Sequence, residues 1–142
     1  MSEPSQPLLH HCAIFSQDLN SSIKFYEDAF GLKVKARWTE LVLSTGSTEQ
    51  TVKMPGVHLE DGAGRRVEVY MSADSNNARQ RQGPINHLAF QVADVACTFQ
   101  RAVAAGATPD TPPSTVKAGT LRGETAFVLG PDGERIELFR FL

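Results

Sequence analysis

The sequence predicts an α+β protein made of two tandem modules, each with the order strand, helix and three strands (βαβββ). Two repeats carry this prediction. His11 and His87 are each followed by Ala two residues later and by Asp seven residues later, and a helical pattern then runs to a glycine. Near the end of each half, Glu68 and Glu137 follow a glycine by four residues and lie between aliphatic neighbours. Internal duplication of this kind indicates two similar modules with a pseudosymmetric site between them.

The first module is expected at residues 9–71. Residues 9–15 alternate between two faces in the manner of a strand. Apolar residues at helical spacing follow Asp18, a suitable N-cap, and stop at Gly31, so a helix is expected between them. The remaining segments rich in β-branched and aromatic residues predict three strands, at 33–43, 49–58 and 66–71.

The second module is expected at residues 85–142. A strand begins at Ile85, and a helix capped by Asp94 ends at Gly106. The segment 108–114 contains three prolines, so it is either a loop or an edge strand. Two further strands are predicted at 125–129 and 135–139. The polar segments outside the modules are interpreted as a flexible N-terminal tail at 1–8 and a linker at 72–84.

Length and charge exclude several classes of protein. The chain has 142 residues, a net charge of −2 and no long run of Lys and Arg, which argues against a nucleic acid or an anionic membrane as partner. Its apolar runs are too short to cross a bilayer, and its first residues lack the apolar core of a signal peptide. A single cytoplasmic domain is therefore expected.

Two histidines and two glutamates form the candidate site. The helix after each first strand must cover one face of its sheet, so His11 and His87 should point to the opposite face. Glu68 and Glu137 lie between aliphatic residues that suit the helix side, so they should point the same way as the histidines. Such groups are costly to bury unless something satisfies them. One divalent cation (Zn, Ni, Co, Mn or Fe(II)) would do so, although a duplication that kept these residues for the fold would leave the same pattern.

Two parts of the sequence are similar to the signatures of a known family. The first is the run from His11 through Asp18-Leu19 and Ile23-Lys24-Phe25-Tyr26 to Phe30-Gly31-Leu32. The second comprises His87-Leu88-Ala89-Phe90 and the run from Gly130 to Leu138. The resemblance is to the vicinal oxygen chelate superfamily, which includes glyoxalase I, methylmalonyl-CoA epimerase, extradiol dioxygenases and the fosfomycin and bleomycin resistance proteins. It implies one glyoxalase-like domain whose modules form an incompletely closed, U-shaped mixed-sheet barrel around a metal.

The resemblance implies that His11, Glu68, His87 and Glu137 are metal ligands. All four ligand positions are filled, a pattern that matches glyoxalase I and the epimerase most closely. Members of the small bacterial glyoxalase I type hold glutathione with an Arg and an Asn at positions that are Phe15 and Ser72 here. These two differences argue against glutathione as a cofactor or as part of the substrate. Extradiol dioxygenases in the superfamily use two His and one Glu, which would be His11, His87 and Glu137.

The expected function is that of a metal-dependent lyase or isomerase acting on a small substrate that chelates the ion through adjacent oxygens. The ion would act as a Lewis acid while Glu137 or Glu68 removes a proton next to a carbonyl. The alternatives are an Fe(II) extradiol-type dioxygenase and a non-catalytic small-molecule (drug) binding protein. Exposed sheet edges favour a homodimer, with the site inside one chain or across two. Residues expected to line the pocket are Tyr70 and Phe139, with Trp38, Arg37, His58 and Arg122 as unassigned candidates.

Overall fold

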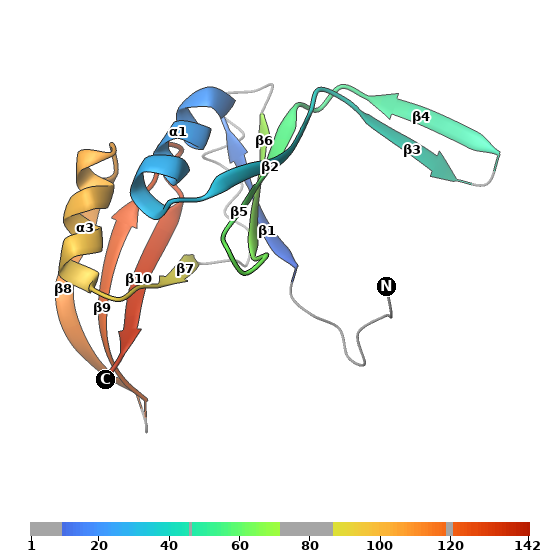
Figure 1. Ribbon diagram of the computed structural model, residues 1–142. Coiled ribbons are helices and arrows are strands. Elements are labelled where there is room, and N and C mark those ends of the chain that lie inside the picture. The colour runs from blue at the N-terminus through green and yellow to red at the C-terminus, as the bar shows by residue number, and fades with distance from the viewer. Residues whose placement is uncertain (1–9, 46, 72–86, 119–120) are drawn as a thin grey trace.

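The computed structural model describes residues 10–45, 47–71, 87–118 and 121–142. The predicted tail at 1–8, the linker at 72–84 and the start of the second module at 85–86 lie outside these residues, as does Ser72. Two four-stranded mixed sheets and two helices make up most of the described chain (Figure 1). The predicted α+β class with two βαβββ-like halves is confirmed, and the sheets do not close into a barrel.

The first sheet has the order β1-β6-β5-β2. Its strands are β1 (His11–Ser16), β6 (Arg66–Met71), β5 (Gly56–Glu60) and β2 (Lys33–Trp38). β1 runs parallel to β6, and the other two pairs are antiparallel. The first strand and the last strand of the module therefore lie side by side, which brings the two ends of the repeat unit together.

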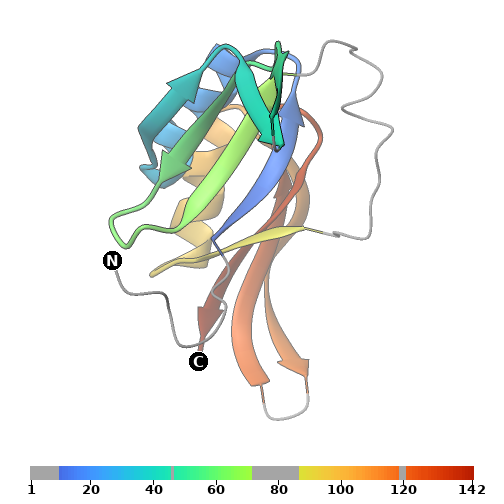
Figure 2. The same ribbon diagram turned by 90° about the vertical axis from the view of Figure 1, so that its right-hand side faces the viewer.

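The second sheet repeats this order as β7-β10-β9-β8. Its strands are β7 (Leu88–Gln91), β10 (Arg135–Phe141), β9 (Leu121–Leu129) and β8 (Thr108–Ala118), and again the first and last strands are parallel. The proline-rich segment predicted as a loop or an edge strand is the edge strand β8, whose register shifts between Pro109 and Ser114. β8 and β9 extend together as a long antiparallel pair (Figure 2).

The helices α1 (Leu19–Phe30) and α3 (Val95–Ala104) begin at the predicted caps. Asp18 accepts a hydrogen bond from the Ser21 N–H at 3.2 Å, and Asp94 accepts one from the Cys97 N–H at 2.8 Å. α1 ends at Gly31, whose φ of 68° lies in the left-handed region that glycine adopts without strain. Each helix packs on its own sheet, and the two helices also contact each other.

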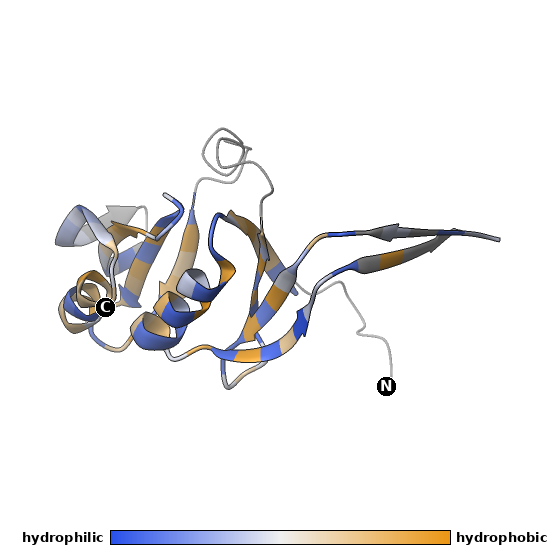
Figure 3. Ribbon diagram, turned by 90° about the horizontal axis from the view of Figure 1, so that it is seen from above, coloured by the Kyte–Doolittle hydropathy of each residue, from blue (hydrophilic) through white to orange (hydrophobic). Residues whose placement is uncertain are grey.

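Alternation along the strands places one face of each sheet in the core and leaves the other for the site. Apolar and polar residues alternate visibly along the ribbons in Figure 3. On the helix side, Val67, Val69, Ile136 and Leu138 are buried with Tyr26 of α1. The aliphatic neighbours of the two site glutamates therefore lie on the helix side of each sheet, as predicted. The glutamates themselves fall on the opposite face.

The predicted strands 33–43 and 49–58 are each divided in two. Residues beyond β2 and before β5 form a separate hairpin of β3 (Leu41–Thr45) and β4 (Thr48–Val52), which projects away from the sheets (Figures 1 and 3). Pro55 separates β4 from β5, because proline has no N–H to donate to a ladder. The high β-propensity of these segments predicts two continuous strands. Propensity does not show where a strand changes its pairing partner, which is where each segment breaks.

A partly buried polar network joins the modules. Tyr26 donates from its hydroxyl to Glu134 Oε1 at 2.9 Å, and Ser22 donates to Asp132 Oδ2 at 2.9 Å. The Gln17 N–H donates to Asp132 Oδ1 at 2.9 Å. The turn between β9 and β10 is thereby tied to α1 of the other module. Neither of the two helices in the described ranges is long and apolar enough to span a membrane.

Candidate metal centre

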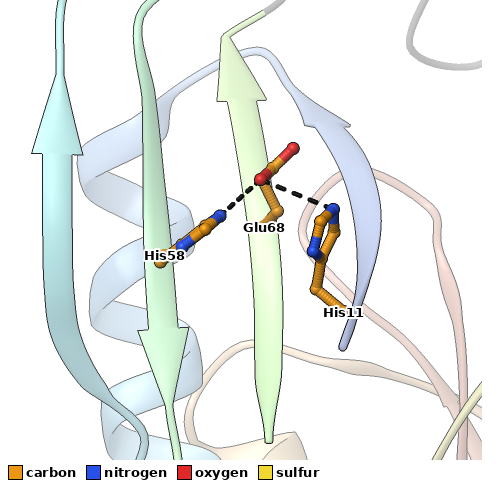
Figure 4. Close-up of side chains that lie close together, drawn as sticks. All are labelled: His11, His58 and Glu68. Carbon is orange, nitrogen blue, oxygen red and sulfur yellow. Dashed lines mark hydrogen bonds and ion pairs between the residues drawn. The ribbon is translucent and has the colours of Figure 1, made fainter. Parts of the chain in front are cut away.

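Three potential ligands converge on the face of the first sheet that α1 does not cover. One nitrogen each from His11 and His58 and one oxygen from Glu68 lie within 4.8 Å of one another. They come from three adjacent strands, β1, β5 and β6, and point toward one another (Figure 4). His11 Nε2 lies 3.6 Å from Glu68 Oε2, and His58 Nε2 is in hydrogen-bond contact with the same oxygen. Two imidazole nitrogens and a carboxylate oxygen are a donor set that suits Zn²⁺ and related divalent ions.

Strand register explains this convergence. Glu68 is paired with Ala13 on one side and with His58 on the other. Paired residues in neighbouring strands point to the same face, as does the residue two positions away along a strand. His11, His58 and Glu68 therefore share one face because β6 lies between β1 and β5.

Glu68 is an ionised carboxylate held by several donors. Burial alone would raise its pKa, but hydrogen bonds from Tyr70 and His58 and the nearby His11 outweigh that effect and hold the pKa below its usual value. The same arrangement raises the pKa of Tyr70 to about 12, through burial and its hydrogen bond to Glu68. Tyr70 was predicted to line the pocket, and it contacts the candidate ligand directly.

A second layer of contacts orients the His11 ring. Arg66 Nη1 lies 2.7 Å from His10 Nε2, and His10 Nδ1 lies 2.8 Å from His11 Nδ1. Arg66 can only donate, so His10 accepts at Nε2 and donates from Nδ1 to His11. This leaves His11 Nε2 to face Glu68. With Nδ1 accepting, a neutral His11 carries its proton on Nε2. A ligand imidazole usually donates from the nitrogen that does not hold the ion, so metal binding at Nε2 would require this proton to move to Nδ1.

Trp38 packs beside these residues. Its ring meets the rings of His58 and Tyr70 edge-on, with centroids 5.2 and 5.8 Å apart. Gly56 lies beneath it, where a Cβ would come within 2.7 Å of the indole. The Trp38 Nε1–H is buried and has no hydrogen-bond partner among the described residues. An aromatic wall with one unused donor therefore borders the three candidate ligands.

The second module carries the other predicted pair. His87 Nε2 lies 3.0 Å from Glu137 Oε2, and Thr125 donates to Glu137 Oε1 at 2.9 Å. The His87 ring also meets Phe127 edge-on, with centroids 5.5 Å apart. The pair is thus formed as in the first module, and in both modules a hydroxyl group also binds the carboxylate, from Tyr70 to Glu68 and from Thr125 to Glu137.

The structure gathers the four predicted ligands as two pairs. Within the described ranges, the one group with three close metal-type donors is that of His11, His58 and Glu68, without His87 and Glu137. Ligand roles for His11, Glu68, His87 and Glu137 remain a prediction. His58 was named only as an unassigned pocket candidate. The missing signal was the register of β5 against β6, which hydrophobic alternation does not provide.

Both pairs are partly open to solvent. The side chains of His11 and His87 are 36% and 33% exposed. Two hollows on the described surface lie elsewhere, one near Asp94 and Arg140 and one near Lys33 and Gly62. Neither hollow contains a set of metal-type donors comparable to His11, His58 and Glu68.

A comparison with protein-family models identifies the superfamily of this chain. The model of the Glyoxalase/Bleomycin resistance protein/Dioxygenase superfamily matches residues 8–138. The chain belongs to this superfamily. The resemblance noted in the sequence is thereby confirmed for the family, whose members differ widely in reaction.

Individual relatives agree with this family. The chain is 29% identical over 132 residues to the uncharacterised protein YwbC of Bacillus subtilis, covering 93% of this chain and 96% of YwbC. Among solved structures, a glyoxalase-superfamily domain from a Frankia species matches with a TM-score of 0.68 and 19% identity, covering 97% and 100% of the two chains. A glyoxalase I variant from Zea mays matches with a TM-score of 0.65 and 21% identity, covering 92% of this chain and 43% of the maize chain. At these identities the structural matches establish the fold.

Proposed function

We propose that the protein is a metal-dependent lyase or isomerase of the glyoxalase-like type. Its substrate would be a small molecule that offers two adjacent oxygens to a divalent ion and loses a proton next to a carbonyl. The observation that carries the proposal is the convergence of His11, His58 and Glu68 on the uncovered face of the first sheet. The His87–Glu137 pair at the equivalent place in the second module supports it.

The proposed ligands are His11, Glu68, His87 and Glu137, drawn from both modules. When bound, the ion supplies Lewis-acid activation of a carbonyl oxygen. The partial exposure of His11 and His87 supports a site that is completed when the two module faces meet, either within one chain or across a homodimer. A cytoplasmic location remains part of this proposal.

Glu137 is the better candidate for the catalytic base. Glu68 is bound by His58 and Tyr70 and has a lowered pKa, which makes it a weak proton acceptor. Glu137 is bound by His87 and Thr125, and its side chain is more exposed, at 19% against 10% for Glu68. A proton acceptor must reach its substrate, and Glu137 is the more accessible of the two carboxylates.

Two measurements test this function. Elemental analysis of protein purified without a metal-affinity tag should find about one transition-metal ion per site. Proton NMR in D₂O should then detect exchange of the hydrogen next to the carbonyl in a panel of 2-oxo and 2-hydroxy carbonyl compounds. Glu137→Gln should remove that exchange and retain the protein's fold. A protein that takes up no metal would instead support a non-catalytic binding protein.

A ring-cleaving Fe(II) dioxygenase is a second candidate. The observation that favours it is the donor set itself, because two His and one carboxylate are the usual ligands of non-haem Fe(II) oxygenases. Oxygen consumption by the Fe(II)-loaded protein with a catechol would support this candidate. The lyase or isomerase would exchange the proton without consuming oxygen.

A further inference from the structure

The two modules correspond residue by residue around the site. Ala13 is paired with Glu68 across β1 and β6, and Ala89 is paired with Glu137 across β7 and β10. Each of these alanines follows a histidine by two residues. The structural register therefore places the His11–Glu68 and His87–Glu137 pairs in equivalent positions, independently of the sequence repeat.

The residue paired with each glutamate on its other side, the third position of each site, differs between the modules. His58 is paired with Glu68 across β5 and β6, whereas Phe127 is paired with Glu137 across β9 and β10. The rings also occupy matching places, since the His58 centroid lies 5.5 Å from that of His11 and the Phe127 centroid lies 5.5 Å from that of His87. The first module has an imidazole nitrogen where the second has a hydrocarbon ring edge.

The charges beside the two pairs do not differ in this way. In the second module the guanidinium carbon of Arg135 lies 3.8 Å from the centre of the Phe127 ring, and Asp110 holds its Nε at 3.0 Å. Arg66 is at the equivalent position in the first module, where Glu60 holds its Nε at 2.8 Å. Both arginines are paired with a carboxylate, so the ring at the third position is the difference that bears on metal binding.

We propose that His58 is a metal ligand, so that His11, His58 and Glu68 hold a divalent ion mainly on the first module. The inference rests on the metal dependence proposed above and goes beyond its ligand set, which does not include His58. The His87–Glu137 pair then contributes less to metal affinity and more to contacts with the substrate. Three protein ligands from adjacent strands also leave coordination positions for substrate oxygens.

The test compares Co²⁺ binding by the wild-type chain and by single-residue variants, measured by the visible absorption of the ion and by calorimetry. His58→Phe gives the first module the residue of the second. His58→Gln can still hydrogen-bond to Glu68 but lacks a basic ring nitrogen. Both variants should bind Co²⁺ at least about tenfold more weakly. His87→Ala should weaken binding less than either of them.

Phe127→Leu is the matched control in the second module, and it should bind Co²⁺ as the wild type does. Circular dichroism of each variant checks that the fold is retained, and His58→Gln carries the test if His58→Phe does not fold. Unchanged binding by His58→Gln, together with weakened binding by Glu68→Gln, would overturn the role of His58 and leave the proposed function intact. No Co²⁺ binding by the wild type would overturn both.

Discussion

His58 stands directly opposite Glu68 in the β5–β6 ladder, and the two side chains are in hydrogen-bond contact. The Glu68 side chain is only 10% exposed, so its charge needs partners that the protein or a bound ion must supply. The partners that the protein supplies are Tyr70, His58 and His11. An ion bound at this centre would replace the contacts that His58 and His11 make with the Glu68 carboxylate.

Removing the charge at this centre should remove metal affinity. We expect Glu68→Gln to bind Co²⁺ or Zn²⁺ at least about tenfold more weakly than the wild type, because the amide replaces an anionic ligand. Calorimetric titration measures the effect. Glu27→Gln changes an exposed carboxylate on α1 and serves as the control. Equal affinity in the Glu68 variant would place the metal elsewhere.

Close packing of Trp38 on Gly56 should make this glycine hard to replace. In Gly56→Ala the new Cβ would come within 2.7 Å of the Trp38 ring, so the indole must move. We expect a loss of about 1–3 kcal/mol in the free energy of unfolding. Gly62→Ala is a matched control, because its Cβ would meet no atom within 4 Å and its φ is not left-handed. Urea unfolding of the two variants should differ clearly, and similar values would refute the packing argument.

Asp132 should contribute to the stability of the contact between the modules. It accepts hydrogen bonds from the Gln17 N–H and the Ser22 hydroxyl, both in the other module. We expect Asp132→Ala to lower the free energy of unfolding by about 1–3 kcal/mol, since both donors lose their acceptor. Asp132→Asn keeps one acceptor oxygen and should be milder. If the alanine variant unfolds at the same urea concentration as the wild type, the network does not join the modules energetically.

Glu134 should make stability depend on pH. Its burial raises the pKa above the ordinary value of 4.5, despite hydrogen bonds that favour the ionised form. The folded state therefore prefers the protonated carboxyl, and this contribution is present below pH 4.5 and lost as the pH rises through the folded pKa. Glu134→Gln has no such titration. Its free energy of unfolding should thus improve relative to the wild type between pH 4.5 and pH 7. A difference that is constant with pH would contradict the raised pKa.

Much of the fold was predictable because local patterns determine it. The repeat, the two N-caps and the glycine after α1 set the helices, and alternation set the face on which His11 and Glu68 lie. The division of the segments 33–43 and 49–58 into β2, β3, β4 and β5 was missed, since strand propensity continues through each segment and does not show where the pairing partner changes. The proline-rich β8 was limited to an edge strand or a loop, and its pairing with β9 decided between them.

The sequence by itself determined the two-module architecture and the four residues that repeat in it, because periodicity and duplication are properties of the chain. The tertiary structure alone decided which side chains meet. It placed His58 beside Glu68 and Phe127 beside Glu137, a difference that depends on which strand lies next to β6 and to β10. Non-local strand register is fixed by the packing of the whole sheet, so no spacing within a single strand could reveal it.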